Sequence, residues 1–519
     1  MLTFPSISLI TKTMKLLIIE NPRPLTIEHY NDVANAPLSA SLNSGYALAV
    51  ARRAGWDTAH LDFTSSTDTP EILSAAILAE RADLVLFHWV YSWGHEKTVR
   101  AVLDLLRQES DVPLGAFGLF PTLSRARLFH YTAGLDFILA GEFEGTLEEL
   151  LNTFSPGTLP ALPGLARPDA PFVPRPLIDD LALLPVPDDV GANCSYASTN
   201  IAASRGCYGD CSFCFIKPYY GCSRRRVRTP DSLERELNER LARRPVNSLY
   251  FIDPSFIAPG RQERERVIAL SRIARATGLP FGFETRVDTV EEGLLTILAE
   301  NGASSLFLGI ESGCDSVLQR IDKRITKQQI ADAVRIVKQS GLQLNIGFIM
   351  FEPDSNLGEL EENFSFLDEL GLLDEPDLTA NLLYHNQIVL HGSPAWHTFE
   401  REKRLLVDEN LPFEARYRFR DERVGTVCAA MGRLATRYFE AMGRSLGGQN
   451  SECGSHQGKE QWCANDSGIN ALLREAFCTY VNAAGTHSLK QVQELEVHFS
   501  LQLQALFSTA DVHPQFPEP

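Results

Sequence analysis

The chain has 519 residues, of which 44% are hydrophobic and 22% are charged, which is typical of a globular protein with about two to four domains. The formal net charge of −18 argues against a nucleic-acid partner, because such binding depends on neutralising phosphates. No apolar run approaches the ~20 residues of a membrane span, and residues 1–13 lack a convincing signal sequence. Seven cysteines scattered outside one motif also fit a reducing compartment, so we expect a cytoplasmic protein.

Strands and helices alternate over residues 14–155. The apolar segment Lys15–Glu20 predicts a first strand, and helical periodicity over Ser41–Ala54 ends at Gly55, a common helix C-terminal residue. Further strands are expected at 58–63, 83–87, 113–118 and 136–140, with helices at 70–81, 97–108 and 144–154. This alternation predicts a doubly wound parallel sheet, and ligands bind such sheets beyond the carboxyl ends of the strands.

A proline-rich linker and a second alternating region follow. Residues 156–193 contain nine prolines, too many for a regular element. Within residues 194–390, strands are predicted at 199–203, 248–253, 281–286, 305–310, 344–351 and 379–384, with helices between them. Six such units predict a partial (βα)6 barrel whose site lies at the carboxyl ends of its strands. Residues 391–519 are predicted to be mainly helical, with amphipathic helices over 414–445 and 467–508.

A cysteine motif stands at the start of this second region. Cys207, Cys211 and Cys214 have a C-x3-C-x2-C spacing, and three thiolates within eight residues indicate a loop around a metal centre. Zinc normally takes four ligands, and a 4Fe-4S ferredoxin supplies four cysteines. No fourth Cys or His stands nearby, so the spacing favours a cubane cluster with one open iron. A zinc loop or a chance grouping of cysteines is the alternative.

The motif, with Phe213 at its aromatic position, resembles the C-x3-C-x-aromatic-C signature of radical S-adenosylmethionine (SAM) enzymes. The resemblance implies that the three cysteines hold a 4Fe-4S cluster whose open iron chelates SAM. It also implies an external electron donor of the flavodoxin or ferredoxin type, whose electron leads to cleavage of SAM into methionine and a 5′-deoxyadenosyl radical. The SAM-binding residues expected on this basis are Phe213, Asp253, Glu284, Arg286, Glu311 and Ser312.

Specific roles follow from the same resemblance. Glu311 is expected to accept hydroxyls of the SAM ribose, and Arg286 to pair with the SAM carboxylate. A structural ion pair or solvation at the barrel rim is the alternative for Asp253 and Glu284, and also for Arg286 and Glu311. The segment 347–354 departs from the G-x-I-x-G-x-P-x-E pattern of many relatives, since Phe351 replaces the second glycine. No adenine contact is therefore assigned to it.

Two segments of the first region carry a second resemblance. The sequences G-L-F-P-T at 118–122 and G-E-F-E-G-T at 141–146 resemble those of the cobalamin-binding domain found in front of many radical SAM enzymes. Glycines there allow backbone to approach a flat macrocycle closely. The cobalamin-binding residues expected on this basis are Ser41, Tyr91, Trp93, Gly118, Pro121, Thr122, Gly141 and Glu142. The D-x-H-x-x-G motif, whose histidine ligates cobalt, is missing, and a domain that has lost cobalamin is the alternative.

Together these resemblances imply a cobalamin-dependent radical SAM enzyme with a small-molecule substrate. Methyl transfer to an unactivated carbon or phosphorus centre in a biosynthetic pathway is the leading hypothesis. A cyclase or ring-rearranging enzyme is one alternative, and a catalytically inactive cobalamin-binding or redox-sensing protein is another. A methylthiotransferase is disfavoured because residues 1–190 contain no cysteine for a second cluster. The sequence identifies no catalytic residue.

Overall fold

The computed structural model describes residues 13–23, 41–90, 95–190, 198–410, 412–445, 466–486 and 489–510. The chain divides into two compact units. The first unit comprises Met1–Pro24, Ser41–Cys194 and Asn238–Arg244, and the second comprises Leu25–Ala40, Ser195–Leu237 and Pro245–Pro519. The described part of the proline-rich segment, residues 156–190, groups with the first unit. Its expected role as a linker stays a prediction.

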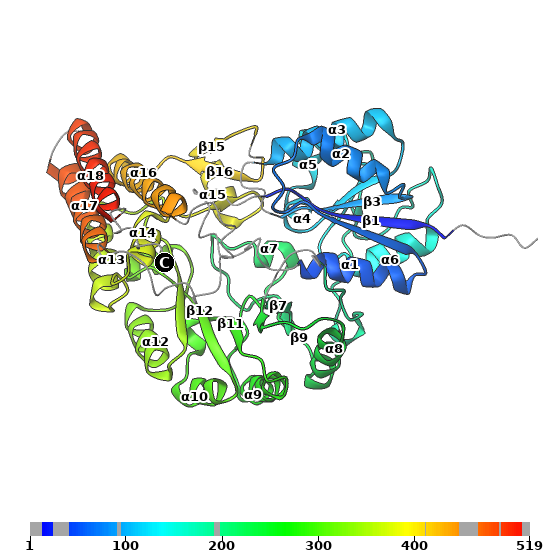
Figure 1. The fold of residues 1–519 in the computed structure, drawn as a ribbon, viewed down its shortest axis with the longest axis horizontal. Coiled ribbons are helices and arrows are strands. Elements are labelled where there is room, and N and C mark those ends of the chain that lie inside the picture. Colours follow the sequence, from blue (N-terminus) through cyan, green and yellow to red (C-terminus); the bar gives the residue numbers. More distant parts are fainter. Residues whose placement is uncertain are drawn as a thin grey trace, which may run out of the picture. The chain divides into compact units, whose positions relative to one another are not determined.

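The first unit contains the expected doubly wound sheet, with strand order β2-β1-β3-β4-β5-β6. Figure 1 shows strands β1 and β3 of this sheet with helices around them. Its strands are β1 (Lys15–Glu20), β2 (Asp57–Asp62), β3 (Leu84–His88), β4 (Leu114–Phe117), β5 (Phe137–Leu139) and β6 (Leu165–Ala166). Its helices are α1 (Leu42–Arg53), α2 (Pro70–Ala79), α3 (Glu96–Glu109), α4 (Leu119–Leu123), α5 (Arg125–Tyr131) and α6 (Glu144–Thr153). Strands β1 to β5 pair in parallel. Strands β3 and β4 are buried throughout, as expected where helices cover both faces of a parallel sheet.

The proline-rich segment corrects the expectation that it holds no regular element. Strand β6 extends the sheet by pairing antiparallel with β5, and a 3-10 helix covers Leu181–Leu183. An edge strand of two residues tolerates neighbouring prolines because few ladder donors are needed. Side chains attach the segment to the unit: Arg175 Nε donates to Thr146 Oγ1 at 2.8 Å, and the Ile178 N–H donates to Glu142 Oε2 at 2.8 Å.

The second unit is built on a five-stranded parallel sheet of order β13-β12-β11-β10-β7. Its strands are β7 (Ser198–Ile201), β10 (Ser248–Phe251), β11 (Phe281–Arg286), β12 (Ala303–Glu311) and β13 (Gln343–Phe348). The helices that alternate with them are α8 (Pro230–Arg243), α9 (Arg261–Ala276), α10 (Glu292–Glu300), α12 (Lys327–Ser340) and α13 (Leu357–Glu369). The short helices α7 (Ile216–Tyr220) and α11 (Asp315–Arg320) lie in connections.

The predicted sixth strand at 379–384 is wrong. These residues belong to helix α14 (Pro376–Tyr384), which begins with a proline in its first turn, where the missing N–H costs nothing. The residues after the helix instead lie beside the segment that follows β13. Asn386 forms one parallel bridge with Phe351, in which the Gln387 N–H donates to the Phe351 carbonyl at 3.1 Å. The (βα)6 expectation is therefore corrected to five strands and a single bridge.

One face of this sheet carries polar side chains and the other carries hydrophobic ones. Tyr250 pairs with Asn200 and Gly282, while Phe307 pairs with Glu284 and Asn345. Paired residues of parallel strands point to the same side of the sheet. One face is therefore shared by Asn200, Tyr250, Gly282, Glu284, Phe307 and Asn345. The alternating positions face the helices and are fully buried: Leu249, Phe251, Phe281, Phe283, Leu306 and Leu308.

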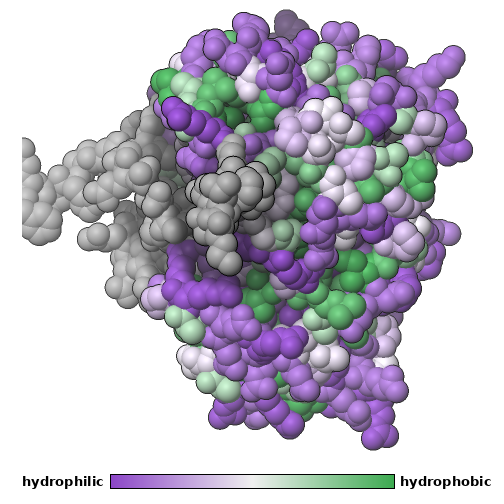
Figure 2. All heavy atoms as spheres, turned by 90° about the vertical axis from the view of Figure 1, so that its right-hand side faces the viewer, coloured by the Kyte–Doolittle hydropathy of each residue, from purple (hydrophilic) through white to green (hydrophobic). Residues whose placement is uncertain are grey.

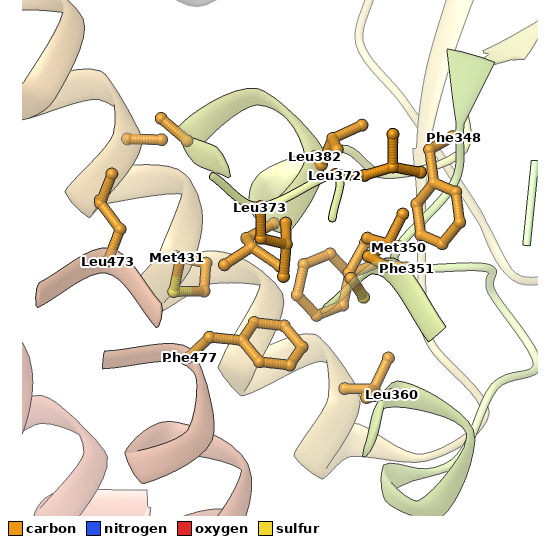
Figure 3. Close-up of a cluster of buried hydrophobic side chains, with 14 of the residues drawn as sticks. Phe348, Met350, Phe351, Leu360, Leu372, Leu373, Leu382, Met431, Leu473 and Phe477 are labelled. Carbon is orange, nitrogen blue, oxygen red and sulfur yellow. The ribbon is translucent and has the colours of Figure 1, made fainter. Parts of the chain in front are cut away.

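The C-terminal region is mainly helical, with one small sheet. Strands β14 (Val389–Leu390), β16 (Glu414–Tyr417) and β15 (Leu405–Val407) pair antiparallel, so 414–417 is a strand rather than the start of a helix. Helices α16 (Glu422–Ser445), α17 (Asp466–Thr486) and α18 (Leu489–Ala510) follow. Figure 3 shows Met431 of α16 and Phe477 of α17 packed with Phe351, so these helices share a core with the end of the sheet.

The face drawn in Figure 2 mixes small groups of hydrophobic residues with polar ones. Within the part of the chain that the structure describes, none of the helices combines the length and the apolar character that crossing a bilayer requires.

Candidate functional site

The cysteine loop starts where strand β7 ends, and its base is fixed by Asp253. Strand β8 (Ser204–Arg205) pairs antiparallel with β9 (Arg226–Val227), which closes the loop at its two ends. Asp253, after β10, accepts the Ala203 N–H at 3.0 Å through one oxygen and the Ser204 hydroxyl through the other. It is completely buried, and this burial raises the pKa of its carboxyl. The sequence predicts that Asp253 binds SAM, but both of its carboxylate oxygens accept hydrogen bonds from the residues at the base of the loop.

Each of the three sulfurs accepts one hydrogen bond. Cys207 Sγ accepts the Gly209 N–H at 3.3 Å, and Cys214 Sγ accepts the Ile216 N–H at 3.5 Å. Cys211 Sγ is 3.4 Å from Nη1 of Arg286. Burial raises the pKa of the Cys214 thiol to about 12. A bound metal centre reverses this, because coordination deprotonates a thiol.

The loop fits an iron–sulfur cubane better than zinc. All three cysteines are free. In the described ranges, no three His, Cys, Asp or Glu side chains converge closely enough for one metal ion, which a zinc site requires. In a cubane each cysteine binds a different iron, so the sulfurs stand farther apart than the ligands of a single ion. Three cysteines whose sulfurs each accept an N–H, with no fourth cysteine in the loop motif, are consistent with a cubane that keeps one iron open.

Arg286, at the end of β11, is held by four contacts. Besides Cys211, its Nη2 donates to the Lys323 carbonyl at 2.8 Å, and its Nε donates to Asp288 Oδ1 at 3.1 Å. The guanidinium also lies over the Tyr208 ring, 5.2 Å from the centroid. This places Arg286 against the cysteine loop. Its pairing with the SAM carboxylate stays a prediction, and the contacts already made occupy much of the guanidinium.

Glu311 stands in an unusual backbone conformation at the end of β12. Its φ is 64°, in the left-handed region, next to a register shift between β12 and β13. Such strain in a non-glycine residue is frequent at functional sites. Lys323 Nζ donates to Glu311 Oε1 at 2.6 Å, and both side chains are buried. A Cβ on Gly309 would lie 2.7 Å from the same oxygen, so glycine there makes room for the pair. The expected contact of Glu311 with ribose stays a prediction.

Of the other expected SAM residues, two pack inside the protein and one lies on the polar face of the sheet. Ser312 is fully buried, and its hydroxyl donates to Asn363 Oδ1 at 2.8 Å. Phe213 packs half-buried against the main hydrophobic core. Glu284 lies half-buried on the polar face of the sheet, where the Tyr250 hydroxyl donates to it at 3.3 Å. Burial raises the pKa of Glu284 to about 7, so this side chain can gain or lose a proton near neutral pH.

In the first unit, the two glycine-containing segments meet at the carboxyl edge of the sheet. Thr122 Oγ1 donates to the Gly118 carbonyl at 2.7 Å and accepts the Gly141 N–H at 2.9 Å. Gly141 has a φ of 72°, and open space surrounds the position of a Cβ there. Gly118 has a φ of 113°, but a Cβ there would lie 2.8 Å from the Trp89 carbonyl. Protein contacts alone thus explain Gly118, whereas Gly141 leaves space for a ligand.

The remaining expected cobalamin residues are less uniform. Pro121 lies buried in α4, and the Glu142 carboxylate accepts the Ile178 N–H. Ser41 caps helix α1 by accepting the Ser44 N–H at 3.3 Å. Tyr91 and Trp93 lie outside the described residues.

Sequence reasoning missed a buried polar network at the same edge. His88 Nδ1 is 2.9 Å from Glu20 Oε1, Ser44 donates to that carboxylate, and Arg23 Nη2 lies 3.3 Å from Glu20 Oε2. Burial by itself raises the pKa of Glu20, but His88 and Arg23 outweigh this and hold it well below the usual carboxyl range. No local signal predicted the pairing, because its members come from the ends of two different strands.

This network leaves polar atoms for a ligand. Both amide atoms of Asn21 and the Nε and Nη1 atoms of Arg23 are buried without a hydrogen bond in the described structure. Unpaired buried donors and acceptors are costly, and a bound polar group relieves that cost. Cobalamin carries amide and phosphate groups, so the residues at this edge are compatible with it.

Comparison with known proteins identifies both regions. Residues 201–367 match the model of the radical SAM superfamily, and residues 40–151 match that of the B12 binding domain. The chain combines a B12-binding domain with a radical SAM domain. The identification expected from the cysteine motif and from the glycine segments is thereby confirmed. A radical SAM domain implies a 4Fe-4S cluster and SAM, and a B12-binding domain implies cobalamin.

Curated relatives are methyltransferases in several cases. An uncharacterised methyltransferase of Pyrococcus horikoshii is 29% identical, with 46% of this chain and 54% of that protein covered. The hopanoid C-2 methylase of Rhodopseudomonas palustris is 28% identical, with 44% of this chain and 43% of that protein covered. This chain thus spans about half the length of these two relatives.

A solved structure matches nearly the whole chain. The cobalamin-dependent SAM radical enzyme OxsB, solved with aqua-cobalamin and SAM bound, has a TM-score of 0.74. It is 18% identical, and the match covers 96% of this chain and 80% of that one. The radical SAM methyltransferase TsrM from Kitasatospora setae has a TM-score of 0.58 at 18% identity, with 69% of this chain and 73% of that one covered. At this identity the likeness establishes the fold.

Proposed function

We propose that this protein is a cobalamin-dependent radical SAM methyltransferase that acts on an unactivated carbon or phosphorus centre of a small molecule. The observation that carries the proposal is the cysteine loop, in which each of the three sulfurs has an N–H donor. It stands in a chain that also has a B12-binding domain. Relatives include the hopanoid C-2 methylase and a cytidylyl-2-hydroxyethylphosphonate methyltransferase, whose names describe methyl transfer.

The cofactors supply the reactive species. When bound, the cluster and SAM generate a 5′-deoxyadenosyl radical that removes a hydrogen atom, and methylated cobalamin supplies the methyl group. An external one-electron donor of the flavodoxin or ferredoxin type completes the proposal.

The protein's own residues hold these groups and the substrate. Cys207, Cys211 and Cys214 would bind the cluster, and Asp253 holds the base of their loop in place. Tyr250 and Glu284 present a hydroxyl and a carboxyl on the polar face of the sheet, where they can orient a polar substrate group. At the edge of the first unit, Asn21 and Arg23 offer buried polar atoms to cobalamin.

A second candidate function is ring formation or rearrangement. A 4′-phospho-dehydrooxetanocin synthase of Priestia megaterium is 31% identical, with 36% of this chain and 28% of that protein covered. An anaerobic magnesium-protoporphyrin IX monomethyl ester cyclase of Rubrivivax gelatinosus is 25% identical, with 48% of this chain and 47% of that protein covered. The two candidates differ in how SAM is consumed. Methyl transfer through cobalamin uses a second SAM to restore the methyl group, whereas ring rearrangement does not.

The first test is spectroscopic. The protein is purified without oxygen, reconstituted with iron, sulfide and hydroxocobalamin, desalted, and examined by absorption spectroscopy and iron analysis. We expect corrin bands beside a broad iron–sulfur absorption, with the cluster lost in Cys211→Ala and kept in Cys478→Ala, a control on helix α17. Retention of a cluster without corrin would contradict the cobalamin part of the proposal. Loss of the cluster in neither variant would contradict the site.

The second test separates the candidates. The loaded enzyme is incubated with SAM and a low-potential reductant, and the products are measured by mass spectrometry. Formation of both 5′-deoxyadenosine and S-adenosylhomocysteine supports methyl transfer. Formation of 5′-deoxyadenosine alone supports ring rearrangement, and formation of neither supports a protein without catalysis.

A further inference from the structure

The three cluster sulfurs differ in what donates to them. Cys207 and Cys214 accept backbone N–H groups two residues further along the chain, so these bonds follow from the course of the loop itself. Cys211 accepts from the side chain of Arg286, 75 residues away in sequence, on strand β11. Cys211 is also the most buried of the three. Its hydrogen bond therefore depends on a particular side chain and on the fold that brings it there.

The guanidinium is fixed at this sulfur from several directions. The Lys323 carbonyl and Asp288 hold two of its other N–H groups, at 2.8 and 3.1 Å, and Tyr208 lies beneath its face. Gly209 makes room for it, since a Cβ at that position would lie 2.7 Å from Arg286 Nη1. Tyr208 and Gly209 of the loop therefore contact or accommodate the guanidinium, in addition to Cys211.

The charges around Cys211 do not cancel. Lys323 is buried too, but its ammonium is paired with Glu311 at 2.6 Å. The side chain of Arg286 is 8% exposed, whereas that of its partner Asp288 is 27% exposed. Solvent screens the carboxylate more than the guanidinium, so Asp288 offsets the positive charge of Arg286 only in part. Charge and hydrogen bonds at cluster sulfurs are established determinants of reduction potential.

We propose that Arg286 is a positioning residue that raises the reduction potential of the iron–sulfur cluster through Cys211. The cluster gains one electron from a flavodoxin- or ferredoxin-type donor, which loses one electron in return. The added negative charge is stabilised by the guanidinium, which donates to the thiolate and lies in a poorly screened environment. This inference rests on the proposed cluster, and it differs from the sequence-based expectation that Arg286 pairs with SAM.

The experiment is an anaerobic redox titration of the full-length holoprotein without SAM, followed by electron paramagnetic resonance of the reduced cluster. Arg286→Gln is expected to lower the reduced-to-oxidised ratio at a fixed potential at least tenfold, a shift of about 59 mV for a one-electron couple. Arg286→Lys retains the positive charge but loses the planar set of N–H donors. The reduction potential should therefore shift in the same direction, but by less. Arg404→Gln, which removes a guanidinium paired with Asp354, is the matched control and should leave the potential unchanged.

Asp288→Asn gives a test of opposite sign. It removes the negative charge beside Arg286 while the Lys323 carbonyl still holds the guanidinium, so the potential should rise. A merely structural role for Arg286 would not shift the two variants in opposite directions. Unchanged potentials in Arg286→Gln and Asp288→Asn, with SAM affinity alone reduced in the former, would overturn the inference.

Iron content separates the two possible failures. A cluster absent from the wild-type protein refutes the proposed function, whereas a cluster present with unshifted potentials refutes only the inference. If Arg286→Gln fails to retain iron, then Arg286→Lys and Asp288→Asn decide the matter through the signs of their shifts.

Discussion

The carboxylate of Asp253 lies 3.0 Å from the backbone N–H of Ala203 and so joins the end of β10 to the residue before the cysteine loop. The Ser204 hydroxyl donates to the other oxygen of the same carboxylate. A buried acceptor that uses both its oxygens on one loop determines where the loop begins. The position of the three cysteines therefore depends on a neighbouring strand as well as on their own sequence.

Replacing this carboxylate should loosen the loop. In Asp253→Asn one oxygen becomes an amide donor that faces the Ala203 N–H or the Ser204 hydroxyl, which leaves a buried donor unpaired at a cost of about 1–3 kcal/mol. We expect lower iron retention after desalting, measured as iron per protein, together with a lower unfolding midpoint. Asp231→Asn, on the exposed side of α8, is the control and should retain iron normally. Full iron retention in Asp253→Asn would show that Asp253 does not hold the loop.

A methyl group added at Gly309 should disturb the ion pair beside it. The new Cβ would lie 2.7 Å from Glu311 Oε1 and 2.9 Å from Lys323 Nζ, so the pair must move. If Glu311 binds the SAM ribose, Gly309→Ala should weaken SAM binding at least tenfold by isothermal titration calorimetry, or about 1.4 kcal/mol. Gly432→Ala is the control, since nothing lies within 4 Å of a Cβ there and alanine favours the helix α16. Equal SAM affinity in both variants would argue against Glu311 as a SAM contact.

Protonation of Glu284 should make stability depend on pH. Its pKa is raised by burial from an ordinary 4.5 to about 7, so the folded protein holds the proton more tightly than the unfolded chain. Stability is therefore expected to fall as pH rises between these two values and to level off above them, by at most ~3 kcal/mol. Glu284→Gln removes this dependence, so its unfolding midpoint should exceed that of the wild type by more at about pH 8 than at about pH 5.

The comparison is made by thermal unfolding of the full-length chain, with Glu234→Gln on the exposed side of α8 as the control. A constant difference between Glu284→Gln and the wild type at both pH values would contradict the raised pKa.

The Glu20 network should give the opposite dependence. Because His88 and Arg23 hold the pKa of Glu20 below its ordinary 4.5, its contribution is complete above that value and is lost as pH falls below it. Glu20→Gln breaks a buried charge pair, so a loss of about 3–5 kcal/mol is expected at neutral pH. The difference in stability between Glu20→Gln and the wild type should become smaller in acid. Thermal unfolding at several pH values measures this difference.

Glu80→Gln provides a matched control for this prediction. Glu80 pairs with Lys15 at 2.7 Å, but both side chains are partly exposed, so the loss should stay below about 1 kcal/mol. Similar losses in Glu20→Gln and Glu80→Gln would mean that the buried network stabilises no more than a surface pair.

The pattern of residues along the chain predicted most elements, and its failure at residues 379–384 is informative. Strands such as β1 and β3 are short apolar runs that alternate with helices along the chain, and their partners follow from the alternation. The segment 379–384 is also short and contains large hydrophobic residues, but it follows Pro376 and packs as helix α14 against α16 and α17. Short apolar runs do not distinguish a strand from a buried helix, so tertiary packing decides between them.

The candidate site shows the same division. The spacing of Cys207, Cys211 and Cys214, with Phe213 among them, lies within eight residues and is visible in the sequence alone. So are the glycine segments at 118–122 and 141–146. These local patterns identified a metal loop and a cofactor domain, because a ligand held by one loop requires its donors to be close in sequence.

Only the tertiary structure decided what surrounds these segments. The contact of Arg286 with Cys211 and that of His88 with Glu20 each join residues about 70 positions apart. Parallel strands are connected by helices of a dozen or more residues, so side chains at neighbouring strand ends are always distant in the sequence. The sequence alone therefore predicts the cluster cysteines and the cofactor domain, and the sheet determines the charges and hydrogen bonds around them.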